Sequence, residues 1–376
     1  MNKKLLLGTT VLVAAGIATS GVAKAEDPIS AGISGYFKSA MGFVDQDGGA
    51  GEFADSANTH TLANDIEITV SGSTTLDNGI TAGFSANIEG NNGGNTVDER
   101  HVYFTGAMGE IKVGQTESAR QSMTQFSASG NYNFGVNSPF FIFANPGNSA
   151  GFFNVRTYDD GLGDEDNLKV IYFTPSFNGF KVGASYSPGD TENDSYGGNG
   201  NDAAAGLQNN ASVAAEYVGS FGDVGIRLMA GMEQYVLERC NASAGTQTCE
   251  DQPTSEQLGA QLTFGNFAVG GGVLTTEQIT QTTAGGGRER EDMDVGISYW
   301  SGNYGIGAGI GVAELDQTDG STDTLELYEV NATYVLGPGI DIGASIRNGE
   351  FNDASGAPAT SDNEFTEVSI SAALSF

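Results

Sequence analysis

The sequence has few of the residues on which most enzymes depend. It contains only 2 His, 2 Cys, 1 Trp and 8 Pro in 376 residues, and its 15 Lys and Arg stand against 47 Asp and Glu, a formal charge of −32. So acidic a surface repels phosphate backbones, which argues against a nucleic-acid partner. No nucleophile elbow, Walker loop or metal-protease helix is present. We therefore expect a protein that is not an enzyme.

Glycine is abundant instead, and it excludes a mainly helical chain. The sequence has 56 Gly, each of which costs about 1 kcal/mol relative to Ala in a helix interior. The glycines follow no three-residue period and 39% of the residues are hydrophobic, so neither a collagen-like nor a disordered chain fits. The composition indicates a folded, β-rich protein.

Residues 1–25 have the pattern of a secretory signal peptide. Lys3 and Lys4 precede an apolar run from Leu5 to Ala18, and Ala23-Lys24-Ala25 is a small-x-small cleavage site. The run is shorter than the roughly 20 residues of a membrane-spanning helix. We expect export, cleavage after Ala25 and a mature chain of residues 26–376.

Export would place the two cysteines of the chain in an oxidising compartment. Cys240 and Cys249 flank one polar segment, and in an oxidising compartment we expect them to form a disulfide that closes this loop. The segment offers too few other ligands for a metal site. A free reactive thiol pair is not typical outside the cytoplasm.

From residue 28 onward one pattern repeats, in which about ten residues alternate between apolar and polar and then meet a turn or a polar segment. Segments 66–70, 224–230, 293–299 and 340–346 each have one face without charge. This period of two is typical of β-strands. Seven short turns and eight longer connections can be counted, which predicts sixteen strands. The short turns lie near 76–79, 107–110, 177–179, 221–223, 265–266, 301–303 and 337–339; the longer connections lie near 45–58, 90–97, 118–166, 188–208, 237–254, 280–290, 316–322 and 351–362.

A meander of sixteen strands fits a membrane barrel better than a soluble one. A soluble barrel turns its apolar face inward, and sixteen strands would enclose a lumen too wide for side chains to fill. An apolar outer band, a polar lumen, short turns at one rim and long loops at the other are the arrangement of outer-membrane barrels. The last strand alternates strictly up to the C-terminal Phe376. The aromatic residues expected at the membrane interfaces are Tyr186, Tyr217, Trp300, Tyr304 and Tyr334.

Two hairpins carry a specific resemblance. Residues 100–106, Arg-His-Val-Tyr-Phe-Thr-Gly, lead into 109–115, Gly-Glu-Ile-Lys-Val-Gly-Gln, and residues 172–180 read Tyr-Phe-Thr-Pro-Ser-Phe-Asn-Gly-Phe. Together with the signal peptide, the strand count and the terminal Phe, they make the whole mature sequence resemble the Gram-negative general porins of the alphaproteobacterial type. The resemblance implies a homotrimer of sixteen-stranded barrels in the outer membrane, among lipid and lipopolysaccharide, with no required cofactor. It also implies that the third long loop folds into each lumen.

The longest connection, 118–166, is the expected pore-constricting loop. Its aromatic residues can pack against the wall or line the narrow part of the channel, and both interpretations stay open. The loop departs from the family's pattern, because residues 118–157 contain no Asp or Glu and Gln115 stands where the family usually has Arg. The residues assigned to the constriction are Phe126, Tyr132, Phe134, Phe140, Phe141, Phe143 and Arg156.

Strand parity assigns the charged residues to the lumen, since a charge facing lipid costs roughly 2–4 kcal/mol near the midplane. Acids outnumber bases there, so we expect a water-filled diffusion channel for small hydrophilic solutes and ions with a weak cation preference. The pore-lining candidates are Lys38, Asp65, Glu67, Lys112, Gln115, Arg120, Lys169, Lys181, Arg227 and Arg347. The further acids on lumen-facing positions are Glu89, Glu216, Glu233, Asp292, Asp294, Asp341 and Glu367.

Some alternatives stay open. The acids at the end of the long loop resemble a crude calcium loop without EF-hand spacing; they could bind calcium, bridge to lipopolysaccharide through divalent ions, or simply be solvated. A substrate-specific channel and a non-conducting structural or adhesin barrel are the alternative functions. The acids in question are Asp159, Asp160, Asp164 and Asp166.

Overall fold

Sixteen strands make up most of the described chain, with one short helical turn between the fifth and sixth. The computed structural model describes residues 28–46, 58–90, 97–131, 133–137, 143–144, 154–158, 162, 167–188, 207–237, 253–279, 287–317, 320–352, 354 and 363–376. None of these residues lies in a helix that is long and apolar enough to cross a membrane. The strands are β1 (Ser30–Gln46), β2 (His60–Thr75), β3 (Thr81–Glu89), β4 (Arg100–Gly106), β5 (Gly109–Gln115), β6 (Leu168–Phe173), β7 (Phe180–Ser187), β8 (Leu207–Phe221), β9 (Val224–Leu237), β10 (Thr254–Phe264), β11 (Phe267–Ile279), β12 (Gly287–Ser301), β13 (Tyr304–Asp316), β14 (Thr322–Gly337), β15 (Ile340–Asn352) and β16 (Asn363–Ser375).

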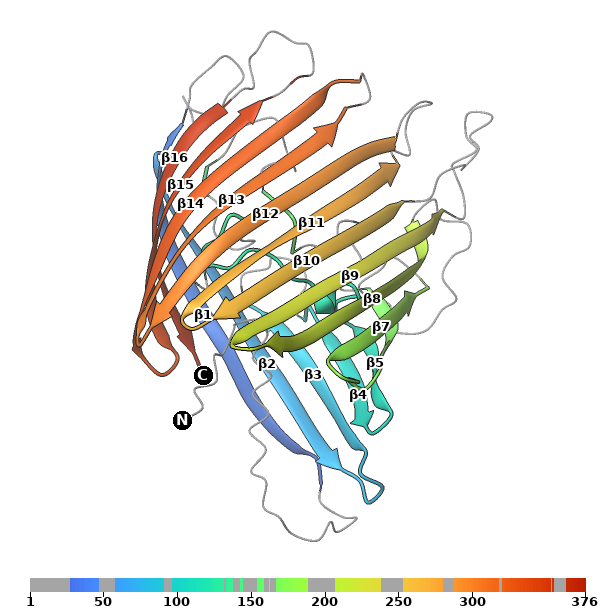
Figure 1. The fold of residues 1–376 in the computed structure, drawn as a ribbon. Coiled ribbons are helices and arrows are strands. Elements are labelled where there is room, and N and C mark those ends of the chain that lie inside the picture. The colour runs from blue at the N-terminus through green and yellow to red at the C-terminus, as the bar shows by residue number, and fades with distance from the viewer. Residues whose placement is uncertain are drawn as a thin grey trace.

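The strands close into one barrel (Figure 1). Each pairs antiparallel with its neighbours in sequence, and β1 closes the ring on β16, from Tyr36 opposite Ser375 to Gln46 opposite Phe365. Closure leaves no open strand edge, so the strand backbones can all hydrogen-bond within lipid. The predicted sixteen-stranded antiparallel barrel is confirmed.

Short and long connections alternate, as the sequence predicted. The seven that follow β2, β4, β6, β8, β10, β12 and β14 are short and lie at one end of the barrel, the short-turn rim. Gly222, Gly265 and Gly302 take φ angles of 60°, 58° and 59° in three of these turns, a conformation that a side chain would strain. The eight longer connections leave the opposite end, the long-loop rim.

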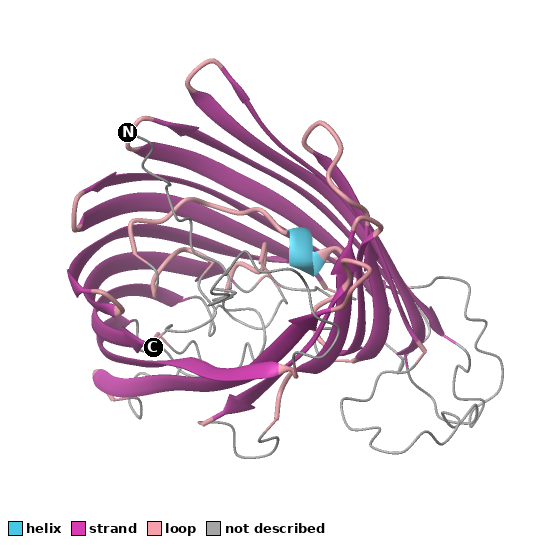
Figure 2. Ribbon diagram, turned by 90° about the horizontal axis from the view of Figure 1, so that it is seen from below, coloured by secondary structure: helices cyan, strands magenta, loops and turns pink. Residues whose placement is uncertain are grey.

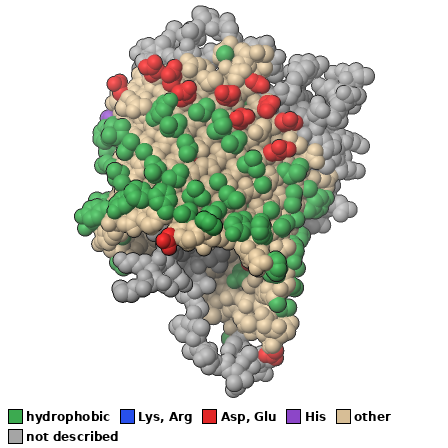
Figure 3. Space-filling model, viewed as in Figure 1, with side chains coloured by type: hydrophobic (Ala, Val, Ile, Leu, Met, Phe, Trp, Pro, Cys, Tyr) green, Lys and Arg blue, Asp and Glu red, His purple; other side chains and the backbone are tan. Residues whose placement is uncertain are grey.

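Side chains alternate between the outside and the inside of the barrel. On β12, Met293, Val295 and Ile297 are exposed outward, whereas Asp292 and Asp294, which alternate with them, are buried inside. The same alternation holds along β16 up to the C-terminus. Figure 3 shows the outward apolar residues as a broad band on the face in view. This band matches the apolar outer band expected of a membrane barrel.

Aromatic rings meet on the outer surface close to the short-turn rim. Three pairs have ring centroids 4.8 Å apart: Phe180 and Tyr217, Phe267 and Tyr299, and Tyr304 and Tyr334. The expectation was wrong for Trp300. Its ring lies beside the inward face of Gly305, because it alternates with the exposed Tyr299 and therefore points into the barrel.

Glutamates form a row on the outer surface above the apolar band, toward the long-loop rim (Figure 3). Several of them are directly opposite one another on neighbouring strands. The opposed pairs are Glu277 and Glu289, Glu291 and Glu314, Glu326 and Glu350, and Glu350 and Glu364. Like charges in directly opposed positions destabilise a sheet.

Glu350 faces a glutamate on both sides, so Glu350→Gln should stabilise the barrel. Removing its charge relieves two repulsions of about 0.2–1 kcal/mol each. We expect a higher unfolding temperature in detergent at low ionic strength, and a smaller gain at high salt, where exposed charges are screened. Glu256→Gln is the matched control, because Glu256 is opposite Thr275 and Met232 and has no acid across from it. An equal gain in both variants would contradict the repulsion.

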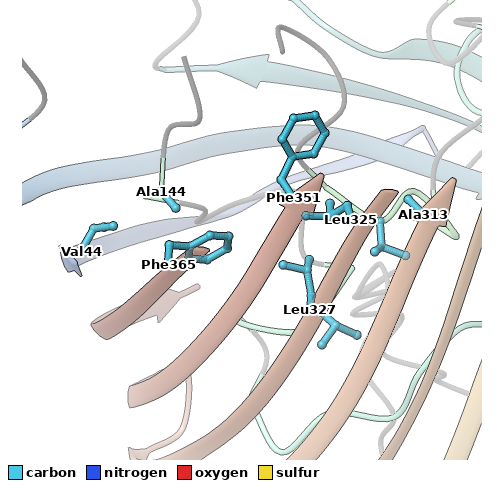
Figure 4. Packing of buried hydrophobic residues seen from close by; sticks show 9 residues of the cluster. Val44, Ala144, Ala313, Leu325, Leu327, Phe351 and Phe365 are labelled. Atoms are coloured by element: carbon cyan, nitrogen blue, oxygen red, sulfur yellow. The ribbon is translucent and has the colours of Figure 1, made fainter. Parts of the chain in front are cut away.

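The apolar core lies inside the barrel, near the long-loop rim. Inward-facing Leu325, Leu327, Phe351 and Phe365 of β14 to β16 are buried together, as Figure 4 shows. Val136, Ala144 and Val155, from the connection between β5 and β6, complete this cluster together with Val44 and Ala313. The core therefore joins an internal loop to the wall.

Candidate functional site

The connection between β5 and β6, residues 116–167, is called the inner loop. Figure 2 shows its described parts inside the ring of strands. Near the start of the loop the chain forms one 3-10 turn, η1 (Gln121–Met123). The backbone N–H groups of Ala119 and Arg120 donate to the hydroxyls of Ser185 and Ser212 on the wall, at 3.0 and 2.9 Å. Hydrogen bonds to the wall take the place of helical ones.

Arg120 fixes the start of the inner loop through a buried ion pair. Its Nε lies 3.2 Å from Oε2 of Glu233 on β9, and its Nη1 donates to Oε1 of Gln257 on β10 at 2.9 Å. Both charged side chains are fully buried. Ser118 Oγ and Asn210 Nδ2 also donate to the Glu233 carboxylate. Such a pair is stable only while its remaining hydrogen-bonding groups are satisfied, as they are here.

Wall carboxylates accept the loop's backbone further along. Glu367 Oε2 on β16 accepts the N–H groups of Phe143 and Ala144 at 2.8 and 3.2 Å. Asp292 Oδ1 on β12 accepts the N–H of Arg156 at 3.0 Å. The part of the loop that lacks acids, residues 118–157, is therefore bound by the acids of the wall. These carboxylates are occupied by hydrogen bonds and do not face the open lumen.

Arg347 on β15 joins two of these wall acids. Its Nη2 lies 2.7 Å from Oε2 of Glu329, and its Nη1 lies 3.6 Å from Oε1 of Glu367. Nη2 also donates to the carbonyl oxygen of Gly135 in the inner loop at 2.9 Å. Parity had placed Arg347 in the lumen, and it does point inward. Its charge, however, is buried between wall and loop.

The remaining predicted pore residues fall into two groups. Lys169 is buried and donates to the carbonyl oxygen of Thr116, and Gln115 is buried where β5 ends. Lys38, Asp65, Glu67, Lys112, Lys181 and Arg227 lie on inward positions of β1, β2, β5, β7 and β9. The second group borders the part of the lumen that the described loop residues leave uncovered.

Some of the predicted constriction residues are described by the structure, and others are not. Phe134 is buried against Ala40 of β1, and Phe143 packs beside both. Phe126 is half-buried, as is Arg156. Packing is thus the role of Phe134 and Phe143. Tyr132, Phe140, Phe141, Cys240, Cys249, Asp159, Asp160, Asp164 and Asp166 lie outside the described residues.

The inner face of β1 to β3 carries an acidic group. Lys38 Nζ lies 3.4 Å from Asp65 Oδ2 and 3.9 Å from the ring centroid of Tyr36. The Tyr36 hydroxyl donates to Glu67 at 3.4 Å, and Glu67 is directly opposite Glu89. Asp341 of β15 also faces inward, in the register row of Lys38 through Ala373. Four carboxylates thus surround one ammonium group, for a formal charge of −3.

The inner face of β5 to β9 is different. Lys112 and Lys181 lie over the same Phe173 ring, at 5.7 and 4.5 Å from its centroid. Lys112 pairs with Glu110 at 3.6 Å, and Arg227 pairs with Glu216 at 3.5 Å. Three bases and two acids leave a formal charge of +1. The lumen wall therefore has an acidic side and a weakly basic side.

Glu99, just before β4, is only half-buried, unlike the wall acids that bind the loop, and adds to the acidic side. Thr116 Oγ1 and Asn87 Nδ2 donate to its carboxylate at 3.0 and 2.9 Å. Burial raises the pKa of Glu99, and the hydrogen bond from Thr116 offsets only part of that rise.

Sequence reasoning missed some of the residues that bind the loop. Arg290 makes a two-pronged contact with Asp292, at 2.7 and 2.8 Å, and Glu329 binds Arg347. Both Arg290 and Glu329 lie on inward positions, so parity was an available signal. Neutral Gln257 and Asn210, by contrast, gave no signal of their contacts with Arg120 and Glu233.

The comparison with protein families decides what kind of barrel this is. A family described as Gram-negative porin matches residues 8–354. The chain belongs to the Gram-negative porin family. The porin is therefore a channel of the outer membrane, with its short turns toward the periplasm and its long loops outside.

Several solved structures share the porin's fold. The anion-selective porin from Comamonas acidovorans has 15% identity and a TM-score of 0.63, over 93% of this chain and 100% of that one. The trimer form of OmpT, an outer membrane protein of Vibrio cholerae, has 13% identity and a TM-score of 0.63, over 93% and 100%. The outer membrane channel DcaP of Acinetobacter baumannii has 13% identity and a TM-score of 0.60, over 93% and 97%. At these identities the likeness concerns the fold alone. No curated protein sequence matches the chain.

The acids of the described residues are spread over the wall. Among these residues, no group of three or more His, Cys, Asp or Glu side chains is placed to hold a metal ion. The predicted calcium residues are not among them. Calcium binding thus stays a prediction.

Proposed function

We propose that the porin is a general diffusion channel for small hydrophilic solutes and ions, with a weak preference for cations and without enzymatic activity. One observation carries the proposal. The described parts of the inner loop contact the wall from β6 to β16 and, near the long-loop rim, β1 and Ala63 of β2. Of the inward acids on β2 and β3, Asp65 is buried beside Lys38, whereas Glu67 and Glu89 are only half-buried and face the passage. Carboxylates along a water-filled passage concentrate cations and repel anions.

The buried acids do not enter this balance. Glu233, Asp292 and Glu367 face the loop and are matched by arginines or backbone donors. Counting them as lumen charge would overstate the selectivity. The remaining excess of acid over base is small, which is why the proposed preference is weak.

Reversal potential and single-channel conductance in a planar bilayer under a KCl gradient test the proposal. Large, steady currents with a reversal potential of cation sign are expected. An anion-signed potential, as the name of the Comamonas porin would suggest for that protein, would overturn the cation preference and keep the channel. Silence of the folded protein would favour the structural barrel, and saturable block by one solute would favour a substrate-specific channel.

As the pH is lowered, the cation preference should begin to weaken at a higher pH than the usual pKa of a glutamate would predict. Because burial raises the pKa of Glu99, its carboxylate takes up a proton as the pH falls before it reaches about 4.3, the usual glutamate value. Reversal potentials between about pH 8 and pH 4 should therefore begin to move toward zero above that pH. In Glu99→Gln the part of this early change that Glu99 contributes should be lost; an unchanged titration would contradict the assignment.

The assembly is part of the same proposal. A trimer is supported by the family and by a structure of similar fold, OmpT of Vibrio cholerae, described in a trimer form. We expect three conductance steps for each insertion and a trimer-sized band on a gel of the unheated protein. The signal peptide and the disulfide between Cys240 and Cys249 lie outside the described residues and stay predictions.

A further inference from the structure

Asp294 of β12 holds three separate parts of the inner loop on one carboxylate oxygen. Its Oδ2 accepts the backbone N–H of Ser127 at 3.2 Å, Nδ2 of Asn137 at 2.7 Å and Oγ1 of Thr157 at 2.7 Å. Its Oδ1 accepts the N–H of Gly272 on the wall at 2.8 Å. Four donors thus satisfy one buried carboxylate.

These three contacts come from distant points of the loop. Ser127 belongs to the outgoing limb, Asn137 to its middle and Thr157 to the returning limb, and Asn137 also donates to Thr157 at 3.2 Å. Asp294 is therefore a point at which both limbs meet the wall; neutral Gln257 of β10 is another, since it binds Arg120 and Thr157. Glu367 and Asp292, by contrast, each bind one stretch of the loop backbone.

Glycines around Asp294 allow the loop to lie directly on the wall. A Cβ added to Gly296 would lie 3.0 Å from Cβ of Ser127, and closer still to the carbonyl oxygen of Ala128. A Cβ at Gly272 would meet the carbonyl oxygen of Gln125 at 2.7 Å. Further inward glycines against residues 125–130 are Gly259, Gly270, Gly305 and Gly307. At these glycines the strands β10 to β13 present backbone to this limb, and Asp294 supplies the side-chain contact with Ser127.

We infer that Asp294 and the glycines of β10 to β13 form the seat that positions the inner loop and so sets the width of the channel. Asp294 is a positioning residue, since it acts through the loop and its charge lies behind the loop. With the carboxylate present, the loop rests against the wall and the passage stays open beside it. The inference rests on the proposed function as a conducting porin.

Asp294→Asn tests the clamp. The Asn side chain has one acceptor oxygen and one NH2 group, so the NH2 faces either the three loop donors or the N–H of Gly272. With the clamp weakened in either orientation, the loop should leave its seat and enter the lumen. We expect the unit conductance to change by about twofold or more, with frequent transitions between levels in place of steady openings. Asp341→Asn is the matched control: it removes an inward wall carboxylate for which no loop contact is found among the described residues. It should shift the reversal potential and leave openings steady, whereas Asp294→Asn should do the reverse.

Gly296→Ala tests the seat without changing any charge. The new methyl group should push Ser127 and Ala128 off β12 and reproduce the unsteady openings. Gly32→Ala is the control, because a Cβ at Gly32 of β1 meets nothing within 4 Å. If Asp294→Asn does not fold, Thr157→Val takes its place, because it removes the hydroxyl that donates to Asp294 and leaves the carboxylate unchanged. The gel mobility of the unheated protein shows whether each variant folds.

The outcomes separate the inference from the function on which it rests. Steady, wild-type openings in folded Gly296→Ala together with either folded Asp294→Asn or Thr157→Val would overturn the inference while leaving a conducting porin. A wild-type protein that is folded and silent would overturn the proposed function and, with it, the seat as a determinant of channel width.

Discussion

Replacing Asp65 with Asn and Glu67 with Gln together should abolish most of the cation preference. The two substitutions lower the formal charge of the acidic group on β1 to β3 and β15 from −3 to −1. They also free the Lys38 ammonium from its 3.4 Å contact with Asp65, so that it repels cations in the passage. We expect the cation-to-anion permeability ratio to fall by about two- to fivefold, toward or through unity. Reversal potentials under a KCl gradient measure this ratio.

The control removes the same charge from a different surface. Glu350→Gln with Glu364→Gln takes two negative charges from the outer surface, where these residues are directly opposite each other and exposed. Their field is screened within about 10 Å at 0.1 M salt, so the reversal potential should barely move. Equal shifts in the two double variants would mean that overall charge, not the uncovered wall, governs selectivity.

Arg347→Met should cause the largest loss of stability. It leaves Glu329 and Glu367 buried, at 3% and 1% exposure, without the guanidinium that lies between them. Breaking a buried pair from one side costs about 3–5 kcal/mol, because the remaining charge is uncompensated. The loss should appear as a lower temperature for conversion of the folded form to the unfolded gel band. The loop should also loosen, since Arg347 donates to Gly135.

Two further variants bear on the reason for that loss. Arg227→Met removes a base whose side chain is 37% exposed and 3.5 Å from Glu216, and exposed pairs contribute only about 0–1 kcal/mol. Adding Glu329→Gln to Arg347→Met should restore part of the stability, since one unpaired charge is removed. If the double variant is no more stable than Arg347→Met, the loss of stability comes from lost packing and not from an unpaired charge.

Much of the barrel could be predicted from local patterns. Period-two alternation, turn residues and the polarity of each face gave sixteen strands and their connections, because each strand must satisfy lipid on one side and water on the other. The assignment of Asp65, Glu67, Lys38 and Lys112 to inward positions needed only the parity of their own strands. Which face of a strand a side chain occupies thus follows from the few residues beside it in the sequence.

The loop could not be predicted in the same way. Its anchors are more than a hundred residues away in several cases, as for Ser118 and Glu233 or Ser127 and Asp294. Near the long-loop rim the polarity of β14 also reverses: Glu326 points outward and Leu325 and Leu327 point inward, because the strand leaves the apolar band outside while it packs on the loop inside. A rule that every charge faces the lumen fails there.

Alternation and turns by themselves determined that this chain is a sixteen-stranded barrel with an excess of acids on its inward positions, since strand pairing and burial in lipid depend on short-range periodicity. Tertiary structure alone decided which acids remain available to ions. Glu233, Asp292, Asp294 and Glu367 have the same inward parity as Asp65 and Glu67. They differ from the half-buried Glu67 because the described parts of the inner loop bind them, and a carboxylate buried against loop donors no longer acts on the passage.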